Sequence, residues 1–216
     1  MDLFDDLPPA PDEACTAIAP GAVLLRGFAR DAVAALLQAL DEITQAEPPQ
    51  HLQTPGGFTM SVQTTSCGRL GWVSDRHGYR YTTHSPHTTL PWPAMPACFA
   101  ALAHDAAAQA GYPGFEADAC LINEYVPGAK MSLHQDKDER DLRAPIVSVS
   151  LGLPCVFQFG GLQRKAPTQR LRLAHGDVLV WGGPSRLAFH GVLPLADGQH
   201  PLLGRRRVNL TFRKAG

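Results

Sequence analysis

The spacing of hydrophobic residues predicts two helices in the first half of the chain. A short apolar run at residues 21–28 is typical of a strand, and Val33, Leu36, Leu37, Leu40 and Ile43 then recur at helical spacing. Asp31 stands near the start of this helix, and Pro48-Pro49 ends it. A second, alanine-rich helix is predicted from Pro96 to Ala110, with Gly111 as its C-cap. Each helix is expected to pack by one face.

The second half of the chain shows the patterns of apolar and polar residues that are typical of β-strands. Apolar or alternating segments occur at residues 121–125, 146–153, 156–159, around Gly176, and in the terminal segment that ends at Arg213. Pairs of Gly and Pro residues separate them. Short strands at this spacing predict a sandwich or jelly-roll barrel, with the two helices on one side. The fold class is therefore α+β, and residues 21–216 are expected to form one domain.

The stretch at residues 54–81 is expected to be irregular and is rich in Gly, Thr and aromatic residues. Its aromatic rings, Trp72, Tyr79 and Tyr81, are either core residues or parts of a lid that stacks on a planar ligand. The pattern alone leaves both interpretations open.

Composition restricts the class of protein further. At 216 residues and 44% hydrophobic content, the chain can bury one substantial core. Residues 1–20 combine four prolines with acidic and small residues, which predicts a flexible acidic leader. The net charge of −1 argues against a generic nucleic-acid binder. However, residues 1–50 hold two basic and nine acidic residues, whereas residues 51–216 hold 17 basic and 11 acidic residues, a balance compatible with phosphate contacts.

Cysteine usage and the N-terminus indicate the compartment. The five cysteines are scattered without a Cys-x-x-Cys pair, so neither a disulfide framework nor a zinc cage is indicated. The first residues are acidic where a secretory leader is basic, and no apolar run is long enough to span a bilayer. We expect a soluble, cytoplasmic protein with no membrane contact that acts as a monomer.

Two His-x-Asp motifs are candidates for metal binding. In an extended segment His134 and Asp136 share one face and suit two positions of one metal shell. The second copy, His175-Gly176-Asp177, lies between two apolar runs and is better explained as a hairpin turn in which Asp177 bonds local backbone. His190, downstream of both, offers a third ligand. Two histidines and one carboxylate are typical of non-haem Fe(II) oxygenases, although a zinc hydrolase could use similar ligands.

The terminal strand favours the oxygenase. Arg207, Asn209, Thr211 and Arg213 share one face, while Val208, Leu210 and Phe212 share the other. If the polar face lines the barrel interior, its guanidinium groups need an anion, and the strand's span of roughly 20 Å allows two arginines to bracket a small dicarboxylate. Leu121, Asn123 and Tyr125 share a parity and can face the same cavity. An exposed basic strand end is the alternative.

These residues together resemble the iron and 2-oxoglutarate dependent dioxygenases. The run from Leu121 to Glu139, with Asn123, Tyr125, Pro127-Gly128 and His134-Gln135-Asp136, is similar to that of the bacterial AlkB alkylation-repair enzymes. The resemblance extends from about Gly21 to the C-terminus and excludes the leader. It implies a double-stranded β-helix that uses Fe(II), 2-oxoglutarate and O2 to hydroxylate N-alkyl carbons, with loss of formaldehyde.

The resemblance also implies roles for individual residues. Fe(II) is expected on His134, Asp136 and His190, and 2-oxoglutarate on Leu121, Asn123, Tyr125, Arg207, Asn209 and Arg213. A nucleotide-recognition lid is expected at roughly 54–81, with the flipped base between Trp72 and His134. The full set of expected substrate contacts is Thr54, Met60, Trp72, Tyr79, Arg80, Tyr81, Asp138 and Arg164. The partner is alkylated DNA, single- or double-stranded, with RNA as a second candidate.

Three alternatives remain open at this stage. A 2-oxoglutarate hydroxylase of a protein or small molecule would share the iron site and the arginine strand, and a cupin-like metal-binding module would need neither catalysis nor inward arginines. Asp138 is either a negative charge facing a cationic methylated base or a solvated turn charge. Phe58 stands where relatives carry Tyr, so a hydroxyl contact to phosphate is absent there.

Overall fold

The structure is a computed structural model that describes residues 14–216. The first part of the expected leader, residues 1–13, lies outside the described residues. The rest is not a leader, because strand β1 (Cys15–Ala19) pairs antiparallel with β2 (Ala22–Leu25). The side chains of β1 are mostly exposed, so main-chain hydrogen bonds hold this strand and its composition gave no sign of it. Among residues 14–216, no helix is long and apolar enough to cross a membrane.

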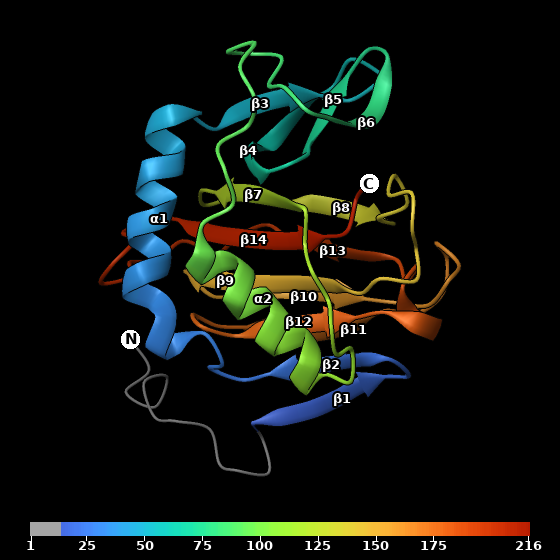
Figure 1. Ribbon diagram of the computed structural model, residues 1–216. Helices are drawn as coiled ribbons and strands as arrows, with labels where there is room; N and C mark the ends of the chain where they lie inside the picture. Colours follow the sequence, from blue (N-terminus) through green and yellow to red (C-terminus); the bar gives the residue numbers. More distant parts are fainter. Residues whose placement is uncertain (1–13) are drawn as a thin grey trace.

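The larger sheet has eight antiparallel strands (Figure 1). Their order across the sheet is β1, β2, β12 (Val178–Trp181), β9 (Ile146–Gly152), β14 (Arg207–Arg213), β7 (Ala119–Tyr125), β4 (Thr59–Gly68) and β3 (Gln50–Gln53). Strand β14 lies between β9 and β7, with Asn209 opposite Ser150 on one side and Asn123 on the other. The terminal strand is therefore central, which places its polar face inside the molecule.

A second sheet packs against the larger one. It has four antiparallel strands in the order β11 (Gln169–Leu173), β10 (Cys155–Phe159), β13 (His190–Val192) and β8 (Met131–His134). Side chains from both sheets share one hydrophobic cluster, to which Leu179 and Trp181 contribute from the larger sheet and Phe157 and Leu173 from the smaller. This two-sheet arrangement agrees with the predicted jelly roll.

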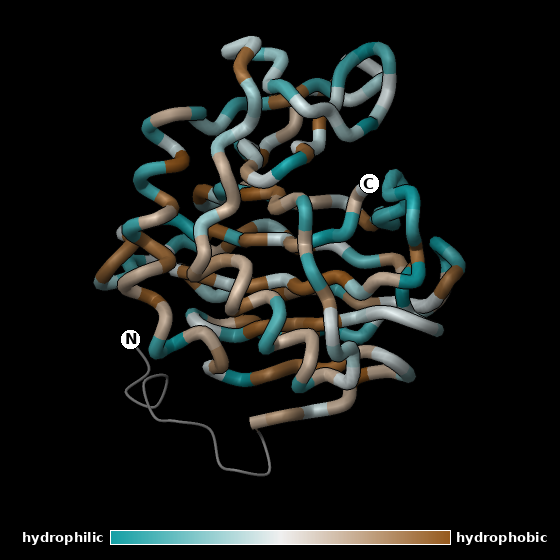
Figure 2. The backbone as a smooth tube through the Cα atoms, in the orientation of Figure 1, coloured by the Kyte–Doolittle hydropathy of each residue, from teal (hydrophilic) through white to brown (hydrophobic). Residues whose placement is uncertain are grey.

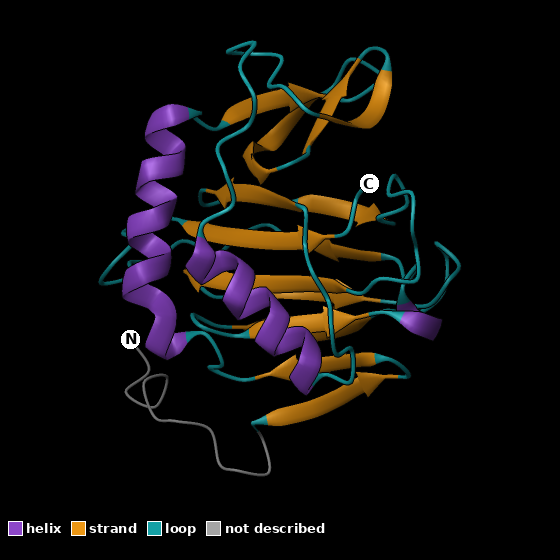
Figure 3. Ribbon diagram, viewed as in Figure 1, coloured by secondary structure: helices purple, strands orange, loops and turns teal. Residues whose placement is uncertain are grey.

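Two helices cover the outer face of the larger sheet (Figure 3). Helix α1 (Val33–Ala46) and helix α2 (Ala97–Gln109) lie where the apolar spacing predicts them. Their buried residues share a cluster with Val208, Leu210 and Phe212 of β14, and the edge of the Phe99 ring meets Phe212 at a centroid distance of 5.8 Å. Apolar residues concentrate in the strands, whereas the connecting loops are largely hydrophilic (Figure 2). The apolar face of β14 thus packs on the helices and its polar face points to the other sheet.

The segment at residues 54–81 is more regular than expected. Strand β4 belongs to the larger sheet, since Gln63 to Gly68 pair with β7, and β5 (Gly71–Asp75) and β6 (Gly78–Thr82) form a separate hairpin above the sheets (Figure 1). The β-branched residues of β4 were the signal for a strand, and the surrounding glycines and aromatic rings obscured it.

Two short 3-10 helices complete the described elements, η1 (Arg30–Ala32) before α1 and η2 (Gly183–Ser185) between β12 and β13. The turn His175-Gly176-Asp177 joins β11 to β12, which belong to different sheets, so the predicted hairpin is wrong. The predicted bond between Asp177 and local backbone is present, from the amide of Ala174 at 2.9 Å.

Candidate active site

Three side chains converge at one end of the smaller sheet. His134 ends β8, His190 begins β13, and the two residues are direct partners across the strands, with ring centroids 4.4 Å apart. Asp136 lies two residues past the end of β8, and its Oδ1 lies 3.5 Å from His134 Nε2 and its Oδ2 3.7 Å from His190 Nε2. The potential ligand atoms of the three residues lie within 4.8 Å of one another. This spacing allows all three to bind one metal ion.

Hydrogen bonds fix which ring nitrogens face the centre. His134 Nδ1 lies 2.8 Å from the carbonyl of Ser132, and His190 Nδ1 lies 3.0 Å from the carbonyl of Ala188. Because a carbonyl only accepts, each Nδ1 carries the hydrogen and each Nε2 lone pair is directed at the other ligands. Burial, followed by the nearby His134, lowers the pKa of His190 to about 4, so this imidazole is neutral at neutral pH.

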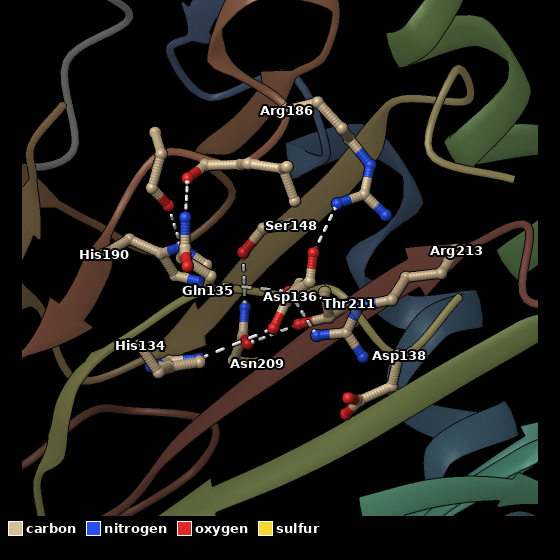
Figure 4. A network of polar contacts seen from close by, with 12 residues as sticks. His134, Gln135, Asp136, Asp138, Ser148, Arg186, His190, Asn209, Thr211 and Arg213 are labelled. Atoms are coloured by element: carbon tan, nitrogen blue, oxygen red, sulfur yellow. Dashed lines mark hydrogen bonds and ion pairs between the residues drawn. The ribbon is translucent and has the colours of Figure 1, made fainter. Parts of the chain in front are cut away.

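Asp136 lies in a strongly cationic environment. Burial by itself raises the pKa of its carboxyl group, but Arg213 and the two imidazoles outweigh that effect and leave the pKa below its ordinary value. The guanidinium of Arg213 bonds Asp136 Oδ2, with Nε at 3.1 Å (Figure 4). Arg213 Nε also lies 3.3 Å from Glu139 Oε1. Asp136 is therefore an ionised carboxylate, the form that can bind a metal ion.

The other His-x-Asp motif is used for structure. Asp177 forms an ion pair with Arg26 at 2.7 Å and accepts the backbone amide of Gly27 at 2.9 Å. His175 Nδ1 accepts the backbone amide of Gly152. Within residues 14–216, the one cluster of three potential metal ligands is His134, Asp136 and His190.

Within residues 14–216, Arg207 has no carboxylate as an ion-pair partner. Its side chain is 1% exposed, lies over the Tyr125 ring at 5.0 Å, and donates from Nη2 to Ser150 Oγ at 3.1 Å. Its Nε and Nη1 have no hydrogen-bond partner among residues 14–216. A buried guanidinium with two free donors is costly, so this position fits a carboxylate ligand. Arg213 already pairs with Asp136, so only Arg207 keeps donors for an added anion, and its role in anion binding stays a prediction.

Three other polar residues line the same cavity as Arg207. Asn123 Oδ1 is buried without a partner in the described part of the chain, and Asn209 Nδ2 donates to Ser148 Oγ at 2.8 Å. Burial raises the pKa of Tyr125 to about 12, so its phenol remains a neutral hydrogen-bond donor. The Tyr125 hydroxyl can thus donate to a small anion beside the candidate metal ligands, whereas both hydrogens of Asn209 Nδ2 are used by Ser148 Oγ and the carbonyl of Val149.

A cavity of about 770 Å³ connects the candidate metal ligands and Arg207 to the β5–β6 hairpin. Predicted site residues that line it are Thr54, Met60, Trp72, Tyr79, Tyr81, Leu121, Asn123, Tyr125, His134, Asp136, Asp138, Arg164, His190, Arg207, Asn209 and Arg213. Arg164 also lies over the Phe189 ring, 5.3 Å from its centroid. The fold therefore gathers residues from both halves of the chain around one space.

Two hydrogen bonds connect the hairpin to the segment that follows the metal ligands. Trp72 Nε1 donates to Asp138 Oδ2 at 2.9 Å, and the Tyr81 hydroxyl donates to Glu139 Oε1 at 2.8 Å. Trp72 and Tyr81 are partners across β5 and β6, and Trp72 stacks on Tyr79 at 5.5 Å. An aromatic face and a carboxylate thus meet at the cavity wall.

Arg80 does not belong to this wall. Strand alternation places it on the opposite face from Tyr79 and Tyr81, where both of its Nη atoms bond the carboxylate of Asp75 within its own hairpin. It does not line the cavity. The cavity therefore gives no support to Arg80 as a substrate contact, which stays a prediction.

Comparison with known proteins identifies the family. A family model described as the 2OG-Fe(II) oxygenase superfamily matches residues 21–213. The chain belongs to this superfamily. The alpha-ketoglutarate-dependent dioxygenase AlkB of Salmonella typhimurium is 57% identical over 215 residues, which cover 100% of this chain and 98% of that protein. The enzyme is therefore an AlkB-type dioxygenase that uses Fe(II), 2-oxoglutarate and O2.

Two further relatives agree with this assignment. The tRNA demethylase abh1 of Schizosaccharomyces pombe is 31% identical over 159 residues, which cover 68% of this chain and 53% of that protein. The solved structure of OsALKBH1 matches with a TM-score of 0.79 at 29% identity, covering 93% of this chain and 99% of that one. The sheet-rich fold is thus shared within the superfamily.

Sequence reasoning missed several residues of the site. Glu139 stands in a run of charges that suggested solvent, yet it is 7% exposed and bonds Tyr81. Arg186 is 3% exposed and contacts the same segment, and no local pattern indicated it. Phe157 and Trp181 also line the cavity, and neither was among the predicted site residues. Beside Arg207 in the sequence, Arg206 pairs with Glu124 and Arg205 with Asp197.

Proposed function

We propose that this enzyme removes alkyl groups oxidatively from N-alkylated bases, such as 1-methyladenine and 3-methylcytosine, in DNA or RNA. The observation that supports it most strongly is the single cavity that joins His134, Asp136 and His190 to an unpaired buried arginine and to the Trp72–Asp138 pair. The likeness to AlkB of Salmonella typhimurium and to a tRNA demethylase supports the same reaction.

Each part of the cavity has a task in this proposal. His134, Asp136 and His190 hold Fe(II) by Nε2, carboxylate oxygen and Nε2, which leaves coordination positions open. Arg207 binds a carboxylate of 2-oxoglutarate through its free Nε and Nη1. When bound, iron and 2-oxoglutarate together supply the oxidation by O2 that hydroxylates the alkyl carbon. The hydroxylated group then leaves as formaldehyde and the base is restored.

The hairpin and the carboxylate recognise the base. Methylation at N1 of adenine or N3 of cytosine leaves a cationic base whose pairing edge is blocked, so extrusion from a duplex costs less than for a normal base. Trp72 offers a ring for stacking, and Asp138, bonded to its indole N–H, places a negative charge beside that ring. We therefore infer that residues 54–81 act as the nucleotide-recognition lid of a monomeric enzyme.

The test is direct. Purified protein with Fe(II) and 2-oxoglutarate should release formaldehyde from oligonucleotides containing 1-methyladenine or 3-methylcytosine. The mass of the modified base should fall by that of one methylene group. Unmodified oligonucleotides serve as the negative control. Formaldehyde release from single-stranded DNA, duplex DNA and RNA that carry the same lesion gives the order of substrate preference. Formation of succinate without formaldehyde from any of them would point to a hydroxylase of another substrate.

The two His-x-Asp motifs provide matched variants. His134→Ala should abolish formaldehyde release, because it removes an iron ligand, whereas His175→Ala should retain it, because His175 bonds the backbone of Gly152. The reverse result would show that the metal lies at the other motif.

A further inference from the structure

Arg186 is a buried cation that connects three points of one chain segment. It follows η2 in the connection from β12 to β13 and is 3% exposed. Its Nη1 donates to the carbonyl of Asp136 at 2.7 Å and its Nε to the carbonyl of Ala144 at 2.8 Å. Its Nη2 forms an ion pair with Glu139 Oε2 at 3.1 Å. Figure 4 shows Arg186 and Arg213 both directed at Asp136.

The segment that Arg186 contacts has no regular structure of its own. Residues 135–145 form neither helix nor strand, although they include Asp136, Asp138 and Glu139. Backbone groups outside helices and sheets need other hydrogen-bond partners, and here the side chain of Arg186 supplies two of them. Gln135 Nε2 adds a bond to the carbonyl of Leu187 at 2.7 Å. The segment is thus held by the β12–β13 connection.

The same connection also orients the second histidine. His190 Nδ1 donates to the carbonyl of Ala188, two residues past Arg186. One short piece of chain therefore sets the direction of His190 and the backbone position of Asp136 together. A shift of Arg186 would change the distance between these two ligands, and partners behind metal ligands commonly affect metal affinity in this way.

The charges around Arg186 are balanced. Glu139 lies between Arg186 and Arg213, with its side chain 1% exposed, and Asp136 pairs with Arg213. The carboxylates of the half-buried Asp136 and the buried Glu139 thus face two buried guanidinium groups. Removal of one cation would leave a buried carboxylate without its partner, which is far more costly than the loss of an exposed ion pair. The segment would then have to rearrange.

We propose that Arg186 is a positioning residue that sets the metal ligand Asp136 and the base-facing Asp138–Glu139 pair as one unit. The part that concerns the base rests on the proposed function, whereas the part that concerns Asp136 does not. Arg186 itself does not line the cavity, so it acts through the residues that it holds.

The experiment compares Arg186→Lys and Arg186→Met with Arg143→Met. Arg143 lies in the same segment and bonds Asp141 with Nε and Nη2, both at 2.9 Å, but its side chain is 92% exposed. Lysine keeps the charge of Arg186 but cannot reach three partners at once. Three quantities are measured: the Kd for Mn²⁺ as a redox-inert probe, the succinate formed per formaldehyde, and the melting temperature.

We expect Arg186→Lys to fold, to bind Mn²⁺ about ten- to a hundredfold more weakly, and to form more succinate per formaldehyde. Arg186→Met should show a larger effect, and Arg143→Met should match the wild type. A lysine variant with a lower melting temperature but wild-type Mn²⁺ affinity and stoichiometry would overturn the proposal, as would failure of both variants to fold. If the wild type releases no formaldehyde, the proposed function fails, and the Mn²⁺ titration still decides the role of Arg186.

Discussion

At the scale of single residues, the site is organised by which buried charges already have partners. Arg213 is paired with Asp136 and Glu139, whereas Arg207 has a ring beneath it and two free donors. Burial of a charge is tolerated when the charge is paired or serves a ligand, so the unpaired arginine is the one that points to a bound anion.

Arg207→Lys should weaken the binding of 2-oxoglutarate by about ten- to a hundredfold, since hydrogen bonds to charged groups contribute roughly 1.5–3 kcal/mol. Lysine keeps the charge but loses the planar fork and the stacking on Tyr125. The dependence of succinate formation on 2-oxoglutarate concentration gives the change in KM. Arg205→Lys is the control, because Arg205 is an exposed partner of Asp197. An unchanged KM in Arg207→Lys would show that the cosubstrate binds elsewhere.

Asp138→Asn should reduce the repair of cationic bases by about ten- to a hundredfold and affect neutral adducts such as 1-methylguanine less. Asparagine can still accept the Trp72 N–H through its Oδ1, so the substitution removes charge and keeps the contact. Competition between the two lesion types in one reaction measures the ratio. Asp141→Asn, which alters a solvent-exposed ion pair in the same segment, should leave the ratio unchanged. Equal losses on both lesions would mean that Asp138 has a structural role.

At the scale of elements, the β5–β6 hairpin is docked by one close approach. A Cβ on Gly71 would lie 2.2 Å from Trp92 Cε2, and Trp92 is fixed by a bond from its Nε1 to the carbonyl of Thr82. No other residue type fits there without movement of the ring or the strand. The position of Trp72 and Tyr81 over the cavity thus depends on a glycine outside it.

Gly71→Ala should displace the hairpin and weaken the binding of methylated oligonucleotides, while Mn²⁺ affinity stays at the wild-type value because His134, Asp136 and His190 lie on other elements. Fluorescence anisotropy of a labelled oligonucleotide gives the first quantity and a Mn²⁺ titration the second. Gly161→Ala is the control, since its added Cβ would meet Ala166 at an ordinary 3.6 Å. Wild-type oligonucleotide affinity in Gly71→Ala would show that the hairpin adapts.

At the scale of the whole molecule, the two faces of the larger sheet have different roles. The outer face contributes to stability and the inner face to the active site. Its outer face shares a hydrophobic cluster with both helices, and its inner face carries the polar residues of β14 that line the cavity. Alternation along one strand therefore supplies both faces. The helices stabilise the sheet without contributing a residue to the cavity wall.

Phe99→Ala should lower the free energy of unfolding by about 3–5 kcal/mol, because it removes a fully buried ring that packs edge-on against Phe212. Urea denaturation followed by circular dichroism measures the change. Activity at 25 °C per folded molecule should remain at the wild-type level. Leu90→Ala, at a side chain that is 63% exposed, should change stability by less than about 0.5 kcal/mol. A large loss of activity in folded Phe99→Ala would contradict this separation.

The sequence by itself determined what depends on local spacing. The period of apolar residues predicted α1 and α2, and the alternation in residues 207–213 predicted a strand with one polar and one apolar face. The types of His134, Asp136 and His190 predicted a metal site, and the resemblance to the dioxygenases implied that the metal is iron. These features follow from the repeat of a helix or a strand, which is fixed by the backbone and visible in any short window.

Only the tertiary structure decided which charges meet. Arg213 and Asp136 are 77 residues apart and Arg186 and Asp136 are 50 apart, so no local pattern relates them. Glu139 and Arg80 both stand among polar neighbours, yet the fold buries the first and directs the second away from the cavity. A charged residue is stable either in solvent or beside a buried partner of opposite charge. The local sequence around it can be the same in both cases. The choice depends on how distant strands are brought together.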